Sequence, residues 1–163
     1  MLLIFQTAPS IISLIDSIII PYFLDKGYEI MEIEIGKKIT KTDIVTSDKL
    51  ACNVGSGSVA VYATPMVVTL IEGAAAELAQ EFVPEGCTTV GTSISIEHMS
   101  ATAEGAEVYA TAQLIESDGR KFEFIVEAYD NAGIIAKGTH QRFSVKTDKF
   151  ISKAMAKLEN KDL

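Results

Sequence analysis

One segment constrains the fold of this chain more than any other: a helical stretch from Met66 to Ala79 that is apolar on almost every side. Pro65 suits the first helical position, where its missing N–H costs nothing, and Thr64 before it predicts an N-cap. A helix that is apolar all round is typically buried. The rest of the chain therefore has to wrap around it.

The wrapping segments alternate apolar and polar residues with a period of two, which is the pattern of half-buried strands. We expect strands over 31–45, 59–62, 88–99, 107–116, 122–129 and 134–146, a loop over 53–58 and a C-terminal helix capped by Thr147. One long helix wrapped by an antiparallel sheet, with a second helix at the C-terminus, is an α+β fold. A single sheet leaves an open edge, which a homodimer or a higher oligomer would cover.

The first 24 residues differ from this body, because they are mostly apolar and carry one charge, Asp16. No basic residue precedes Lys26, which argues against a secretory signal, and polar residues interrupt the stretch too often for a membrane span. It is a helix added to the body, a membrane-associated segment, or an extension upstream of a true start at Met31. We divide the chain into an N-terminal extension (1–30) and one domain (31–163), and expect no membrane association.

Charge and cysteine content exclude several classes of function. The net charge of −8 and the absence of a basic, aromatic-rich stretch argue against nucleic-acid binding. Cys52 and Cys87 do not have metal-ligand spacing, so we expect no metal site and a reducing, cytoplasmic location. Residues 137–161 hold seven basic and two acidic residues. This basic end suits a phosphate-bearing small ligand, or it is a solvated helix face.

Glu72 is the most informative single residue, because it is the only charge between Tyr62 and Ala76. A buried carboxylate is costly unless it is paired, hydrogen-bonded or protonated. It is therefore an acid, base or nucleophile in a dry pocket, or it reaches the helix edge and solvent. Thr64 lies eight residues earlier, about 12 Å along the helix axis. A third group or a neighbouring subunit would have to unite the two side chains.

Two histidines and one glycine complete the candidates. By alternation, His98 shares one strand face with Val90, Thr92, Ile94 and Ile96. If that face packs on the helix, its imidazole points toward Glu72 as a proton-transfer partner; otherwise it is a structural histidine. His140 has no acid or nucleophile near it in sequence, and we expect a structural role. Gly91 marks a bulge or a close approach of a ligand to the backbone.

Three segments in order resemble the hot-dog-fold thioesterases of the fluoroacetyl-CoA thioesterase type: VYATPMVVTLIEGAAAELA, VGTSISIEHMSATAEGAEV and DGRKFEFIVEAYDNAGIIAKGTHQRF. The resemblance covers about Met31 to Lys157. That family uses a Thr, a Glu eight residues later and a His twenty-six after the Glu, and Thr64, Glu72 and His98 keep both spacings. Gly91 matches the glycine seven residues before the His.

The resemblance implies hydrolysis of an acyl-CoA by a homodimer with its sites near the subunit interface. Glu72 would act as nucleophile or as the base that aligns water, and His98 would transfer protons. Thr64 would hydrogen-bond the carboxylate or the substrate, while the Gly91 N–H and the helix N-terminus would stabilise the oxyanion. No metal or separate cofactor is implied, because CoA is part of the substrate.

The substrate contacts are expected at Tyr62, Gly91 and Arg142, with Arg142 and Lys149 meeting the CoA phosphates. The phenylalanine-rich lid of the fluoroacetyl-specific enzyme has no counterpart before Thr64, where Tyr62 and small residues stand. We therefore expect a short or medium acyl-CoA substrate. The alternatives are a non-catalytic hot-dog dimer that binds acyl-CoA or serves as a scaffold and, on fold alone, an enoyl-CoA hydratase.

Overall fold

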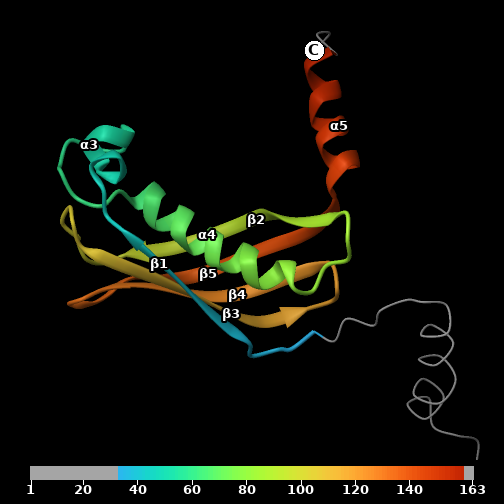
Figure 1. Ribbon diagram of the computed structural model, residues 1–163, viewed down its shortest axis with the longest axis horizontal. Helices are drawn as coiled ribbons and strands as arrows, with labels where there is room; N and C mark the ends of the chain where they lie inside the picture. Colours follow the sequence, from blue (N-terminus) through green and yellow to red (C-terminus); the bar gives the residue numbers. More distant parts are fainter. Residues whose placement is uncertain (1–32, 160–163) are drawn as a thin grey trace, which may run out of the picture. The chain divides into compact units, whose positions relative to one another are not determined.

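The computed structural model describes residues 33–159, in which an antiparallel five-stranded sheet lies against one long helix, α4 (Figure 1). The strand order is β1-β3-β4-β5-β2. The strands are β1 (Lys38–Ile44), β2 (Cys87–His98), β3 (Glu107–Ser117), β4 (Lys121–Asp130) and β5 (Gly133–Lys146). The helices are η2 (Ser47–Lys49), α3 (Ala51–Val54), α4 (Thr64–Gln80) and α5 (Thr147–Glu159). The predicted α+β architecture, with its C-terminal helix, is confirmed.

The predicted N-terminal extension, residues 1–30, lies outside the described residues, so the proposed division of the chain stays a prediction. None of the helices within residues 33–159 is long and apolar enough to cross a membrane.

Helix α4 buries one face against the sheet, through Val67, Leu70, Ile71, Ala74, Ala75, Leu78 and Ala79. Each large aliphatic side chain buried in this way contributes about 1.5–3 kcal/mol. The opposite face, which carries Thr64, Thr69 and Glu77, is exposed. The prediction of a helix buried all round is therefore wrong for the single chain, because the sheet covers only one side of it.

The start of α4 differs from the prediction in a way that matters for the site. Its N-cap is Ala63, and Thr64 already has helical geometry, so the predicted Thr64 cap is wrong. The backbone N–H groups of Tyr62 and Ala63 donate to Thr102 O and Lys49 O, which fixes the entry into the helix without a side-chain cap. The Thr64 hydroxyl is consequently available to another partner.

Three N-terminal expectations are corrected. From residue 33 on, where the described part of the predicted strand 31–45 begins, the strand starts only at Lys38, because Gly36 adopts a φ of +94° in a turn that breaks the extended backbone. The segment 59–62 is not a strand and forms only an isolated bridge between Leu50 and Tyr62. The predicted loop over 53–58 starts later, since Asn53 and Val54 belong to α3.

A bulge in β2 sets the facing of its residues. The register with β5 shifts between Gly91 and Ser93, so Thr92 is one extra residue in the strand. Strict alternation put Val90 and Thr92 on the face of His98, and the bulge makes this wrong. Gly91 instead joins His98 on the side that faces α4. Because of this one extra residue, Gly91 and His98 lie on the same face of β2, although strict alternation places odd- and even-numbered residues on opposite faces.

Candidate active site

The first candidate cluster lies at the N-terminus of α4. Thr64 Oγ1 is 2.8 Å from His98 Nδ1, which joins the first residue of the helix to the last residue of β2. The two side chains line a shallow hollow of about 280 Å³ together with Tyr62 and Met99. Within the described residues His98 Nε2 is buried without a hydrogen-bond partner. An unsatisfied buried nitrogen is costly and calls for an explanation such as a functional role.

The second cluster lies about two turns along α4, where Glu72 leans over β2. Its side chain is 40% exposed, so the interpretation of a carboxylate at the helix edge describes this chain better than a dry pocket. A Cβ built on Gly91 would lie 2.5 Å from Glu72 Oε1, closer than real contacts allow. The carboxylate therefore rests on the backbone at Gly91, and only glycine leaves it this space.

Beneath the carboxylate lies a buried polar pair, His140 and Arg142, which are 1% and 7% exposed. His140 Nε2 is 3.7 Å from Glu72 Oε1, and its Nδ1 is 2.7 Å from the backbone oxygen of Ser93. Arg142 Nη1 lies 3.3 Å from His140 Nε2, while Nε and Nη2 donate to Thr89 Oγ1 and Thr89 O at 2.9 and 2.8 Å.

Burial perturbs the titration of this pair. Desolvation is the main cause that lowers the pKa of His140, and the nearby Arg142 charge lowers it further. Burial also lowers the pKa of Arg142, although the negative charge of Glu72 opposes this effect. At neutral pH His140 is therefore uncharged, and Arg142 is the buried cation of the cluster.

The structure thus brings the predicted residues together in two groups. Thr64 meets His98, and Glu72 meets Gly91, but the histidine beside Glu72 is His140. On sequence alone His140 is expected to be structural, because no acid or nucleophile lies near it in sequence; Glu72 comes from a helix nearly seventy residues away. One available signal was the alternation of β5, which places His140 and Arg142 on one strand face.

The predicted substrate contacts differ in their placement. Tyr62 is 1% exposed and donates from its hydroxyl to Met66 O at 3.0 Å, and burial raises its pKa to about 12. Arg142 uses its nitrogens inside the fold, an arrangement that does not support the predicted contact with a CoA phosphate. Among residues 33–159 no group of three or more His, Cys, Asp or Glu side chains could hold a metal ion.

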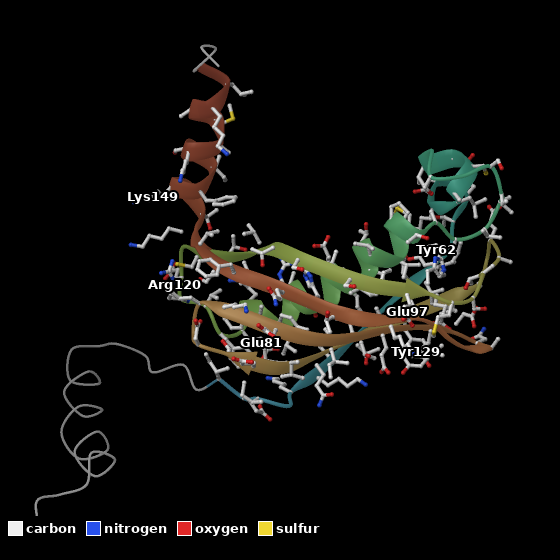
Figure 2. All side chains as sticks on the ribbon, turned by 180° about the vertical axis from the view of Figure 1, so that it is seen from behind. Tyr62, Glu81, Glu97, Arg120, Tyr129 and Lys149 are labelled. Carbon is white, nitrogen blue, oxygen red and sulfur yellow. The ribbon has the colours of Figure 1, made fainter. Side chains whose placement is uncertain are left out.

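Lys149 lies at a different place, where α5 leaves the sheet. Figure 2 shows it near Arg120, at the end of the sheet away from Tyr62. Both residues line a hollow of about 530 Å³ with Lys146, Lys153 and Phe143. The Arg120 guanidinium lies 4.9 Å from the centre of the Phe143 ring. Four cations and an aromatic ring give this hollow the chemistry of an anion-binding surface.

Residues 45–148 match the family model described as fluoroacetyl-CoA-specific thioesterase. The fluoroacetyl-CoA thioesterase of Streptantibioticus cattleyicolor is 34% identical over 97 residues, which cover 60% of this chain and 70% of that protein.

Solved structures extend the likeness to the fold. A structure of the fluoroacetyl-CoA thioesterase FlK has a TM-score of 0.72 and 30% identity, covering 77% of this chain and 98% of that one. A variant of FlK in complex with fluoroacetate and CoA has a TM-score of 0.69 and 28% identity, covering 72% and 99%. A thioesterase superfamily member from Thermus thermophilus, 24% identical, shares the fold with a TM-score of 0.71 over 78% of this chain and 94% of its own.

Proposed function

This chain belongs to the fluoroacetyl-CoA-specific thioesterase family and is a thioester hydrolase with a hot-dog fold, and we propose that it converts a short or medium acyl-CoA to the free acid and CoA. The observation that carries the proposal is the position of the Glu72 carboxylate over Gly91, where only a residue without a Cβ leaves it space. A non-catalytic acyl-CoA-binding dimer has no need of this arrangement.

We assign the chemistry as follows. Glu72 attacks the thioester carbonyl or removes a proton from the attacking water. His98 gives a proton to the departing CoA sulfur, and Thr64 orients the His98 ring through its hydrogen bond. The Gly91 N–H and the first turn of α4 stabilise the negative charge on the carbonyl oxygen. No metal or separate cofactor takes part in this scheme.

A homodimer would complete the site. Thr64 and Glu72 are about 12 Å apart along one helix, so one protomer does not unite them. β2 is an edge strand that pairs only with β5 among the described strands, and α4 leaves one face exposed. Two-fold antiparallel pairing of β2 with its copy reverses the strand and carries the partner subunit's His98 toward Gly91. Each site would then hold Glu72 of one protomer and the partner subunit's Thr64 and His98.

Other features of the substrate and the location follow from the residues present. Tyr62 and small side chains precede Thr64, which favours an acyl group broader than fluoroacetyl. Lys149, rather than Arg142, is the candidate for the CoA phosphates, because it lines the basic hollow at the base of α5. The few cysteines fit a reducing, cytoplasmic location.

Thiol release from acyl-CoAs of rising chain length tests the activity. We expect hydrolysis by the unmodified protein and its loss in Glu72→Gln and His98→Ala. Equal rates for all three proteins would exclude the proposed chemistry at this site.

Mixing the two inactive variants tests the shared site. If Glu72 and His98 act from different protomers, random re-pairing restores about a quarter of the normal activity, since half the dimers gain one intact site of two. No recovery, with mixed dimers demonstrated by differently tagged chains, would show that both residues serve the same protomer.

A further inference from the structure

His140 and Arg142 are buried ionisable side chains next to Glu72, and the chemistry assigned above does not use them. Arg142 is 7% exposed, and its hydrogen-bond partners, Thr89 and His140, are all neutral. A buried guanidinium is costly unless a nearby charge compensates it. The acid that acts on it is Glu72, whose charge favours the protonated guanidinium. Arg142 and Glu72 therefore interact electrostatically, and His140 contacts both of them.

The contacts of His140 fix the position of its proton. Its Nδ1 is 2.7 Å from the Ser93 carbonyl oxygen, which can only accept a hydrogen bond, so Nδ1 carries the hydrogen. In the neutral ring Nε2 then carries a lone pair, which accepts a hydrogen bond from Arg142 Nη1 at 3.3 Å. Glu72 Oε1, 3.7 Å from the same nitrogen, receives no proton from it.

The surroundings favour this neutral ring. The charged groups that face it are Glu72 from α4 and Arg142 from its own strand, while β2 supplies the Ser93 carbonyl and β4 the Phe124 ring at 6.3 Å. Burial and the charge of Arg142 lower the pKa of His140 by more than the Ser93 hydrogen bond and the charge of Glu72 raise it. A proton on Nε2 would displace the Arg142 hydrogen bond and tie Glu72 into an ion pair, which weakens a carboxylate as base or nucleophile.

We propose that His140 is a positioning residue for Glu72: its neutral imidazole, protonated on Nδ1, holds the Arg142 guanidinium beneath the carboxylate and leaves the carboxylate free of an ion pair. This inference rests on the proposed function, because it concerns the same carboxylate. The charge of Glu72 compensates the buried guanidinium, and His140 Nε2 accepts a hydrogen bond from Arg142 Nη1 at 3.3 Å.

The proton position can be measured without any activity. The chain has two histidines, so imidazole ¹⁵N spectra of the labelled protein contain two ring systems, and His98→Ala identifies the one from His140. At pH 7.5 to 8 we expect His140 to be neutral with Nδ1 protonated. A ring protonated on Nε2, or a charged imidazolium at that pH, would overturn the inference.

Two substitutions test the effect on catalysis. In His140→Asn the amide nitrogen can still donate to the Ser93 carbonyl, but nothing replaces Nε2. We expect kcat to fall about 10- to 100-fold with KM within about threefold, since small displacements of a reacting group have effects of this size. In His140→Gln the longer amide can accept from Arg142, and we expect it to recover part of the loss.

A structural control separates positioning from stability. Leu114→Ala removes a fully buried side chain on β3, outside the proposed site. We expect it to lower the melting temperature at least as much as His140→Asn does, while kcat stays near normal. A folded His140→Asn protein with kcat within twofold of the unmodified protein would refute the role of His140. Absence of hydrolysis by the unmodified protein would instead refute the proposed function.

Discussion

The two polar clusters on α4 are built in opposite ways. The Thr64–His98 pair joins the first residue of α4 to the last residue of β2 through one hydrogen bond; Thr64 is exposed, whereas His98 is half-buried and its Nε2 is covered. In the Glu72 cluster, His140 and Arg142 are buried. Of the three side chains, only the Glu72 carboxylate reaches solvent. The Glu72 cluster thus rests on buried side chains, whereas the Thr64–His98 pair lines an open hollow.

This difference also separates stability from activity. The buried cluster is embedded among core strands, so its residues act on folding as well as on chemistry. The Thr64–His98 pair lies outside the buried core, so we expect substitutions there to affect chemistry more than stability. Substitutions in the two clusters should therefore give different combinations of lost activity and lost stability.

The largest effect is expected for Glu72→Gln. The amide keeps the size of the side chain but removes the nucleophile or base, and we expect kcat to fall about 10³-fold. The melting temperature should change little, because the side chain is partly exposed. Glu77→Gln, an exposed glutamate on the same helix, is the matched control and should keep normal activity. Equal losses of kcat in both variants would show that Glu72 has no specific role in the reaction.

The Thr64–His98 pair should give the next largest losses. We expect His98→Ala to lower kcat about 10²-fold, since it removes the group that transfers protons. Thr64→Val should cost about tenfold, because the threonine acts through the orientation of His98. Thr69→Val is the control, since the Thr69 hydroxyl only donates to Pro65 O within the helix. Melting curves that shift by several degrees in His98→Ala would contradict the separation of chemistry from packing at this pair.

Two glycine substitutions sharpen the contrast between a site and a core contact. In Gly91→Ala the new Cβ meets the movable end of Glu72, so we expect kcat to fall about 10- to 100-fold with the fold retained. In Gly138→Ala the Cβ would lie 1.9 Å from the Ser95 backbone oxygen, which cannot move aside. We expect this variant to be strongly destabilised, by about 3 kcal/mol or more. Circular dichroism and thiol release measured on both variants decide the point.

The smallest effect concerns pH. Because the pKa of His140 is lowered in the folded protein, the unfolded chain binds its proton more readily. Stability should therefore fall as the pH drops below about 6.5, the ordinary histidine value, toward the lowered pKa, and should be insensitive to this group above it. We expect the protonation of His140 to lower the melting temperature by less than about 5 °C between pH 7.5 and pH 5.5. His140→Asn should flatten the dependence; an unchanged slope would show that other groups cause it.

Much of the fold and part of the site were predictable from local patterns. Alternation located β2 to β5, and the apolar run located α4, because both depend on residues adjacent in the chain. The spacing of Thr64, Glu72 and His98 identified candidate residues, and the structure joins the first to the third. The failures share one cause: the turn at Gly36, the bulge at Thr92 and the Ala63 cap depend on which distant backbone groups are available for pairing.

The amino-acid sequence alone therefore determined the order of β2 to β5, the position of the long helix and the family resemblance, because these rest on short-range periodicity and spacing. Tertiary structure alone decided that Glu72 lies over Gly91 and beside His140, while His98 turns to Thr64. The physical reason is that one extra residue in β2 reverses which side chains face α4. Packing across strands then determines which residues surround each titratable group, and these neighbours cannot be read from their separation along the chain.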